Sequence, residues 1–377
     1  MNVNSEFSDI VFINDDDALI TLAQNLASKK TFGFDTEFDR FWREYGFKLF
    51  LLQIFDGDKC FLIDPLAVKN MTPLWAVFEN ASICKVAYAC LEDIQVLKIN
   101  GCNIKNIFDL QVAAKLCNHT GNSFADLILE KFNVVINKSN QRSNWRKRPL
   151  TDDQMLYASN DVRWLLQLKD EFFATAINTG VYEMLQEEND LCEKVTVTEY
   201  TVKLSSKQLA IFSPYHQQVL LQLFNVRNGI AKKYNMPPAN IVNDSVLEKI
   251  VEEKALFIKH GFSTGFCSQL LEDNEAQQKF IDIIASIDET IPNLPVKPPR
   301  QTNYESFQQR ETRKELADTH CKLLHEAVTQ KYGVTAGEFI LRGLKKSLQL
   351  RPYIEIELRN YQRKVIDETC LSIGISL

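Results

Sequence analysis

The spacing of hydrophobic positions changes several times over the first half of the chain, which predicts strands and helices in alternation. Residues 19–26 place apolar side chains three or four positions apart, as one helical face does, with Asn14 as the expected cap and 15–17 as an acidic first turn. Apolar runs over 31–38, 48–55, 59–64 and 83–87 predict strands, and Asp56-Gly57 predicts a hairpin between the second and the third. Residues 1–190 are therefore expected to form an α/β domain.

Helical spacing dominates the rest of the chain. Helices are expected over 109–117 and 123–132, and one long helix is expected from Thr151 towards Gly180. From Ser205 onward the pattern is almost wholly helical, interrupted at Pro237-Pro238 and by the proline-rich segment 288–301, which we expect to be a linker. We therefore predict three domains, covering residues 1–190, 205–288 and 303–377.

Composition limits the class of protein. The chain has 377 residues, of which 45% are hydrophobic, and a formal net charge of −6. No stretch approaches the ~18 consecutive apolar residues of a membrane span, and the first residues lack the features of a signal peptide, so we expect a cytoplasmic protein that contacts no membrane. The nine cysteines form no C-x-x-C pair, which favours reduced thiols over a zinc site. The negative charge argues against polyanion binding by the whole surface, but local basic patches remain compatible with it.

A pair of carboxylates near the end of the first apolar strand is the first candidate for chemistry. In the segment FGFDTEF, residues 32–38, Asp35 and Glu37 are two apart and so point to the same face of the strand. Two neighbouring carboxylates repel each other, and a divalent cation relieves that repulsion because hard cations take oxygen ligands. The alternative is an edge strand with solvated acids, since a lone D-x-E pattern is common.

Two later segments add acids in suitable places. Asp93 falls in the first turn of a helix that follows the strand ending near Ala87, where it either stabilises the helix dipole or projects over the strand ends. Tyr157 and Asp161 are four apart on a helix and share one face. The alternative for this pair is a tyrosine packed at the edge of the core beside an exposed aspartate.

Taken together, six segments resemble bacterial ribonuclease D, in the same order and at similar spacing. They are FGFDTEF, LFLLQIFDGDKCFLIDPL, KVAYACLEDIQVL, IFDLQVAAKL, NWRKRPL and YASNDVRWLL, and the resemblance covers about residues 8–190. The order of D-x-E, a later Asp and Y-x-x-x-D is that of the DEDDy class of 3′–5′ exonucleases. Leu156 stands where the related DEDDh class has histidine, so the chain is similar to the tyrosine type.

The resemblance implies a fold, a site and an activity. The fold is α/β: a ribonuclease H-like (DnaQ-like) mixed sheet flanked by helices, followed by one or two all-α HRDC-like domains. Asp35, Glu37, Asp93 and Asp161 would hold two divalent cations, Mg²⁺ or Mn²⁺, and Tyr157 would position the attacking water. The implied enzyme is a monomeric 3′–5′ exoribonuclease that acts on single-stranded 3′ ends, such as those of tRNA precursors, and releases nucleoside 5′-monophosphates.

Basic residues suggest where the strand would bind. A patch made of Lys138, Arg142, Trp145, Arg146, Lys147 and Arg148 would contact phosphates and stack on a base, or is a solvated loop around one buried tryptophan. Residues 207–288 resemble an HRDC domain, carried by 219–251, in which Arg227, Lys232 and Lys233 are candidate phosphate contacts. Residues 303–377 take the place of the second HRDC-like domain of ribonuclease D. The basic run of that block comprises Arg342, Lys345, Lys346, Arg359, Arg363 and Lys364.

Two positions depart from the family pattern, and two other functions stay open. Ribonuclease D usually has His at the place of Tyr88 and Asp at the place of Asn144, and both departures concern substrate contacts rather than metal ligands. The open alternatives are a DNA-directed 3′–5′ exonuclease with the same chemistry and a non-catalytic nucleic-acid-binding module. The presence of all five DEDDy positions argues against the latter.

Overall fold

The computed structural model describes two compact units. It covers residues 9–375 except 42, 122, 198–201, 264, 295–306, 345–347 and 349–357. Unit 1 comprises Met1–Glu37, Leu49–Val197 and Glu305–Leu377, and unit 2 comprises Phe38–Lys48 and Thr198–Tyr304. The second half of the predicted linker 288–301, residues 295–301, lies outside the described residues. These units are defined by packing, and the three-domain division stays a prediction.

A six-stranded mixed sheet forms the centre of unit 1. Its strands are β1 (Ile10–Ile13), β2 (Thr31–Arg40), β3 (Phe47–Phe55), β4 (Cys60–Ile63), β5 (Cys84–Ala87) and β6 (Ile107–Asp109), in the order β1-β4-β3-β2-β5-β6. The pair β3–β4 is antiparallel, whereas β1–β4, β2–β5 and β5–β6 are parallel. This mixed sheet with flanking helices confirms the predicted fold class, and each predicted strand is present within two residues of its expected bounds.

The central strand β2 uses its two faces differently. Phe32 and Phe34 are buried on one face, where their rings meet Phe78 with centroids 5.1 and 5.4 Å away. On the other face Gly33 lies against the helical layer. A Cβ atom at Gly33 would meet Leu165 Cδ1 at 3.0 Å and the carbonyl oxygen of Val162 at 3.3 Å. The alternation of side chains along the strand therefore directs Asp35 and Glu37 towards the same helices as Gly33.

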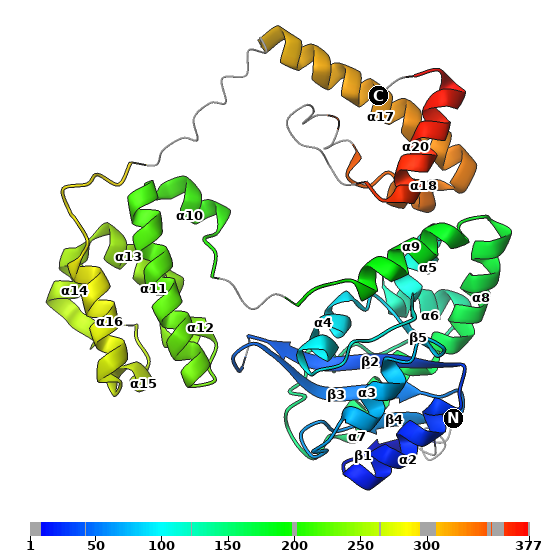
Figure 1. Cartoon of the computed structure of the whole chain (residues 1–377), viewed down its shortest axis with the longest axis horizontal. Helices are drawn as coiled ribbons and strands as arrows, with labels where there is room; N and C mark the ends of the chain where they lie inside the picture. Colours follow the sequence, from blue (N-terminus) through cyan, green and yellow to red (C-terminus); the bar gives the residue numbers. More distant parts are fainter. Residues whose placement is uncertain are drawn as a thin grey trace. The chain divides into compact units, whose positions relative to one another are not determined.

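The helices of the first part of unit 1 follow the predicted order. They are α2 (Asp16–Ala27), α3 (Thr72–Phe78), α4 (Leu91–Ile99), α5 (Leu110–Leu116), α6 (Phe124–Phe132), α7 (Asp152–Arg163), α8 (Leu165–Asn178) and α9 (Tyr182–Glu193). The sequence analysis did not predict α3 or α9, and two further details differ from expectation. Asp15 rather than Asn14 caps α2 by accepting from the backbone N–H of Ala18. The single long helix expected after Thr151 is divided at Trp164, where α7 ends and α8 begins in a new direction (Figure 1).

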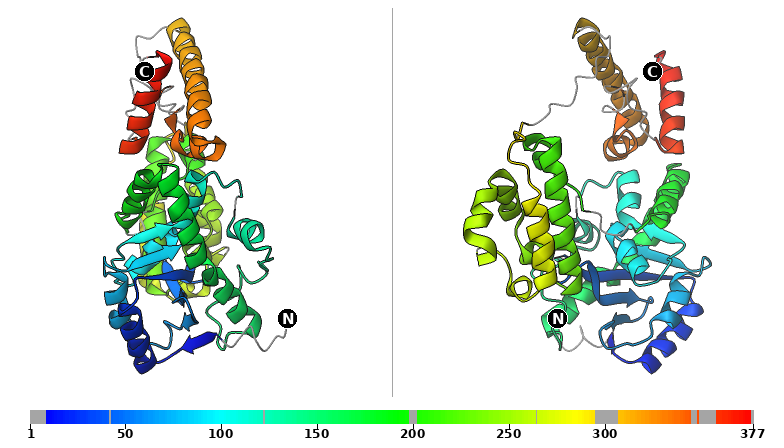
Figure 2. Two further views of the ribbon diagram at one scale, coloured as in Figure 1. Left: turned by 90° about the vertical axis from the view of Figure 1, so that its right-hand side faces the viewer. Right: turned by 60° about the vertical axis from the view of Figure 1, so that its left-hand side comes forward.

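Unit 2 is a helical bundle with its own core. Its helices are α10 (Ser206–Ile211), α11 (Pro214–Lys233), α12 (Pro238–Ile241), α13 (Asp244–Glu252), α14 (Lys254–His260), α15 (Ser268–Leu271) and α16 (Asn274–Ala285), with a 3₁₀ turn at Gly261–Ser263. Helices α11 and α16 lie side by side, which Figures 1 and 2 show from different directions. Leu220, Leu223 and Phe280 are buried between them. The strongly helical reading from Ser205 onward is thereby confirmed.

The last helices belong to unit 1 and pack against its helices α5 and α9. They are α17 (Phe307–Tyr332), α18 (Val334–Ile340) and α20 (Asn360–Ile373). Glu188 of α9 is buried, accepts a hydrogen bond of 2.8 Å from the Tyr361 hydroxyl and pairs with Arg342 and, at 3.5 Å, with Arg359. The neighbouring Glu187 accepts the first backbone N–H groups of α20, from Asn360 at 2.7 Å and Tyr361 at 3.1 Å. The start of α20 is thus fixed by acids of α9.

Among the described residues, no helix is long and apolar enough to cross a membrane.

Candidate active site

Three carboxylates that are far apart in the chain meet beside the central strand. Asp35 and Glu37 come from β2, and Asp161 comes from the last turn of α7. One oxygen from each of the three lies within 4.8 Å of the others. The close packing of Gly33 against Val162 and Leu165 explains this approach, because it brings the end of α7 directly onto the strand two residues before Asp35.

Asp93 lies next to this group from another direction. It is buried in the first turn of α4, as expected from the sequence, and its side chain accepts a hydrogen bond from the Thr36 hydroxyl. Its negative charge contributes to the raised pKa values of both Asp35 and Glu37, although it is not part of the tightest group of three. All four predicted carboxylates are therefore near one another.

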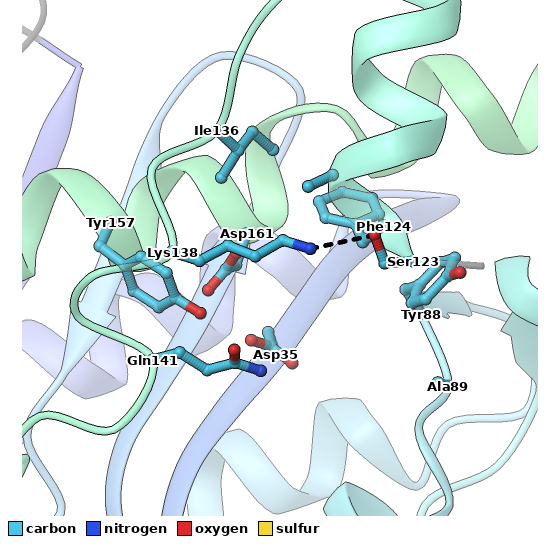
Figure 3. A pocket seen from close by; sticks show the side chains of 11 residues that line it. Asp35, Tyr88, Ala89, Ser123, Phe124, Ile136, Lys138, Gln141, Tyr157 and Asp161 are labelled. Atoms are coloured by element: carbon cyan, nitrogen blue, oxygen red, sulfur yellow. Dashed lines mark hydrogen bonds between the residues drawn. The ribbon is translucent and has the colours of Figure 1, made fainter. Parts of the chain in front are cut away.

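Tyr157 completes the group one helical turn before Asp161. Its hydroxyl points towards the Asp161 carboxylate and interacts with it (Figure 3). Burial raises the pKa of Tyr157 well above its ordinary value, and the negative charges of Asp161, Glu37 and Asp35 raise it further. In the absence of cations, the surroundings of the phenol therefore favour its protonated form.

Burial and mutual repulsion perturb all four carboxyl groups. Desolvation, followed by the charges of neighbouring acids, raises the pKa of Asp35 and of Glu37 well above the usual range. Desolvation raises the pKa of Asp93 to about 6 and that of Asp161 to about 7. Such a cluster is unfavourable when every member is ionised, and a bound cation reverses the sign of that interaction.

The donor set fits a hard divalent cation. It offers carboxylate oxygens, with no thiol or imidazole in the group of three. Oxygen ligands of this kind suit Mg²⁺ or Mn²⁺ rather than softer metals. The cluster thus has the chemistry of a divalent-cation site.

Without cations, stability is expected to fall as pH rises from about 4 to about 7. The folded carboxyl groups have raised pKa values, so in this window the folded state binds more protons than the unfolded state, and deprotonation favours unfolding. Even a net loss of about 2 kcal/mol would lower the melting temperature of a unit of this size by about 4–8 °C. Thermal unfolding in a chelator, compared with the same pH series in millimolar Mg²⁺, measures the effect. A chelator series with no downward trend across this window would contradict it.

A pocket of about 340 Å³ opens beside the carboxylates (Figure 3). Asp35, Asp161 and Tyr157 form one side of it, and Tyr88 and Phe124, whose rings are 5.2 Å apart, form the other. Lys138 crosses the pocket and donates from its Nζ to Ser123 Oγ at 3.0 Å. An aromatic wall, an ammonium group and an acidic floor together suit a nucleotide next to a bound cation.

The sequence did not single out several residues of this pocket. Ser123 and Phe124 were assigned only to the start of a helix, and Gln141 was not considered. Their contribution depends on α6 and the 136–141 segment returning to the site, which no local pattern shows. Tyr88 was noted only as a departure from the family, and that departure does mark a pocket residue.

The predicted basic patch is divided by the structure. Lys138 lines the pocket, and Arg142 is exposed near it. Arg146 is exposed as well, on the following turn. These three stay candidates for phosphate contact.

Two members of the patch have structural roles instead, which corrects the sequence prediction. Trp145 is only 4% exposed and packs on Tyr157 with ring centroids 5.9 Å apart, so its ring offers no face to a base. Arg148 donates to both carboxylate oxygens of Asp64, at 2.6 and 2.8 Å, and to the carbonyl oxygen of Phe50. The alternative of a loop around one buried tryptophan is the one that the structure supports.

Weaker basic candidates are also mostly engaged. Arg227 is buried, with Asp244 at 2.5 Å and the carbonyl oxygen of Val242 at 2.9 Å, so it is a core residue of unit 2. Lys233 pairs with Asp273 at 2.6 Å, and both Lys232 and Lys233 are exposed. In the last block Arg342 and Arg359 pair with Glu188. Lys345 and Lys346 lie outside the described residues.

Comparisons with known proteins agree with this geometry. Residues 10–174 match the family model described as 3′-5′ exonuclease, and residues 216–255 match the HRDC domain. The chain is 37% identical over 158 residues to ribonuclease D of Escherichia coli and 36% over 159 residues to that of a Shewanella species. It is 30% identical over 254 residues to ribonuclease D of Pseudomonas paraeruginosa. These alignments span 42%, 41% and 64% of the relatives' own lengths.

The likeness of the fold extends over nearly the whole chain. The crystal structure of Escherichia coli RNase D, described as an exoribonuclease involved in structured RNA processing, superposes with a TM-score of 0.72 and 21% identity. The superposition covers 96% of this chain and 99% of that one. A protein from Bifidobacterium adolescentis superposes with a TM-score of 0.68 at 19% identity over 95% of both chains. The resemblance to ribonuclease D is confirmed by these matches.

Proposed function

We propose that this chain, whose residues 10–174 are a 3′-5′ exonuclease domain of the ribonuclease D type, removes nucleotides one at a time from the 3′ ends of RNA. The observation that supports this most directly is the convergence of Asp35, Glu37 and Asp161, with Asp93 next to them and the Tyr157 hydroxyl pointing towards Asp161. Products would be nucleoside 5′-monophosphates. The substrates that the resemblance favours are tRNA precursors, whose 3′ ends the enzyme would trim.

The four carboxylates would hold two divalent cations, Mg²⁺ or Mn²⁺. When bound, such ions activate water and stabilise the leaving 3′ oxygen in phosphodiester hydrolysis. The residues of the chain set the geometry: β2 supplies a rigid pair of ligands, and α4 and α7 supply one each. Ligands on a strand and two helices are held more precisely than ligands on loops would be.

Tyr157 would orient the attacking water. The ordinary pKa of a tyrosine phenol, about 10, favours this orienting role over that of a general base. The hydroxyl of Tyr157 already points towards Asp161, and the ring of Tyr157 packs against the ring of Trp145. A water that accepts from or donates to this hydroxyl would therefore have a defined direction relative to the scissile phosphate.

Lys138 would contact a phosphate of the bound strand. Lys138→Ala is expected to raise KM several-fold with a smaller change in kcat, because the ammonium group lines the pocket and donates to Ser123 Oγ instead of to the carboxylate cluster. Loss of one phosphate contact should also weaken the salt dependence: the negative slope of log affinity against log salt concentration should become smaller in magnitude by about 0.7. Lys147→Ala is the matched control, since Lys147 is exposed on the same segment and does not line the pocket. An equal change of KM in both variants would contradict a specific role for Lys138.

The direct test of the function uses RNA with defined ends. A 3′-extended tRNA precursor and a single-stranded RNA are incubated with Mg²⁺ or Mn²⁺, each with a 3′-hydroxyl or a 3′-phosphate. Release of mononucleotides from the hydroxyl ends alone, stopped by a chelator, is the expected result. Equal degradation of both ends, or activity that survives chelation, would overturn the proposal.

Digestion of single-stranded DNA of the same sequence, measured beside the RNA, tests the two alternative functions. A DNA-directed exonuclease would digest the single-stranded DNA at least as fast as the RNA. A non-catalytic module would bind the RNA and the DNA without cleaving either. The cytoplasmic location and the monomeric state stay predictions from the sequence.

A further inference from the structure

The connection between β5 and α4 is a tight turn with an unusual backbone. Residues 88–90 join the end of the strand, Ala87, to the start of the helix, Leu91. Ala89 has a φ of 56°, in the left-handed region that alanine rarely adopts. Asp93 lies in the first turn of the helix that this connection begins, so the conformation of the turn fixes the place of that carboxylate.

Asp109 holds this turn from the neighbouring strand. It ends β6, opposite Ala87 in the parallel β5–β6 pair, and is 3% exposed. Its Oδ1 accepts from the backbone N–H of Ala89 at 3.0 Å, and its Oδ2 accepts from the N–H of Cys90 at 3.1 Å and from the Cys90 thiol at 3.5 Å. Both oxygens therefore bind the turn, and neither contact lies within the cluster of Asp35, Glu37 and Asp161.

The aspartate is itself fixed on two further sides. Its Oδ1 also accepts from the backbone N–H of Gln111 at 2.8 Å and so caps α5. Its own backbone N–H donates to Asn189 Oδ1 of α9 at 3.1 Å. A buried carboxylate with four donors is well satisfied, and only a group with two acceptor oxygens can receive donors on both sides.

We propose that Asp109 is a positioning residue for the cation site: it stabilises the left-handed turn at Ala89 and thereby holds Asp93 where it can act as a ligand. This inference rests on the proposed function, because it assigns Asp93 to a cation. Asp109 does not touch the cation in this scheme. It acts through the backbone of residues 89 and 90.

Asp109→Asn tests the proposal with a measurement that needs no substrate. Asparagine has one acceptor oxygen, so its amide group must face an N–H donor on one side of the turn, and the turn is expected to shift. Binding of Mn²⁺, followed by calorimetry on the whole chain, should weaken about 10–100-fold, the range for the loss of an outer partner of a metal ligand. Asp273→Asn is the control, because Asp273 is also a buried helix cap, in unit 2. That variant should lose stability and keep the wild-type affinity for Mn²⁺.

Asn189→Ala provides a milder variant if Asp109→Asn does not fold. It removes the acceptor for the Asp109 backbone without changing the carboxylate, and Mn²⁺ affinity should fall a few-fold. Wild-type affinity in folded Asp109→Asn, or in Asn189→Ala if the first variant is unfolded, would overturn the positioning role and leave the proposed function standing. Absence of Mn²⁺ binding by the wild-type chain would overturn both.

Discussion

Replacing Asp35 by asparagine is expected to abolish hydrolysis while the fold is kept. Asp35 belongs, with Glu37 of β2 and Asp161 of α7, to the group whose oxygens lie within 4.8 Å of one another. Its replacement by asparagine removes one charged ligand from the proposed cation site. Even outer partners of metal ligands are worth 10–100-fold, so turnover should fall by more than about a hundredfold. Single-turnover release of mononucleotides from a short RNA measures the effect.

Stability gives the second half of this prediction. The pKa of Asp35 is raised because its charge is buried beside Asp93, Asp161 and Glu37, so the neutral asparagine removes repulsion. In a chelator near pH 7, Asp35→Asn should therefore melt at the same temperature as the wild type or higher. Asp58→Asn, at an exposed position of the β3–β4 hairpin, is the matched control and should change neither property. Wild-type turnover in Asp35→Asn would show that the proposed cation scheme is wrong.

Gly33→Val is expected to damage the site without changing any of its chemical groups. A Cβ at residue 33 would lie 3.0 Å from Leu165 Cδ1 and 3.3 Å from the Val162 carbonyl oxygen, and valine adds two methyl groups beyond it. Overpacking of this kind costs about 1–3 kcal/mol. The layer that must retreat includes the end of α7, so Asp161 should move away from Asp35. A displacement of about 1 Å can cost a hundredfold in rate.

The expected result for Gly33→Val is a lowered melting temperature and a fall in turnover well beyond the loss of folded protein. Gly229→Val is the control: Gly229 lies within α11 and nothing occupies the space where its side chain would grow. Turnover on a short RNA should be unchanged there. If Gly33→Val retained full activity per folded molecule, the close packing of β2 on α7 would not be what places Asp161.

Much of the fold was predictable because local patterns report local structure. Four of the six strands and most helices of residues 9–193 follow from apolar spacing and from caps such as Ser123 and Thr151, whose side chains accept the expected backbone N–H groups. The short strands β1 and β6 were not predicted. The break at Trp164 was not predicted. Apolar residues continue through it at helical spacing, and the change of direction is set by packing on β2 at Gly33.

The site was predictable where chemistry repeats a known order and unpredictable where partners are distant. Sequence motifs alone placed Asp35, Glu37, Asp93, Tyr157 and Asp161 in one candidate site, and the structure brings these residues near one another. The error over Arg148 had a different origin, because its partner Asp64 is 84 positions away and nothing near Arg148 shows that its charge is already used. The same holds for Trp145, whose burial depends on Phe50 and Leu62 of other strands.

The contacts of Glu188 with Tyr361, Arg342 and Arg359 form late during synthesis of the chain. Glu188 is synthesised with α9, but Arg342 and Tyr361 follow about 150 or more residues later, after all of unit 2. At about 5–20 residues per second, on the order of ten seconds or more pass on the ribosome before this carboxylate meets its partners. Unit 2 can fold in the meantime, because most of it is the continuous stretch Thr198–Tyr304. The nascent chain would then carry a folded helical bundle before Arg342 and Tyr361 reach the surface of α9.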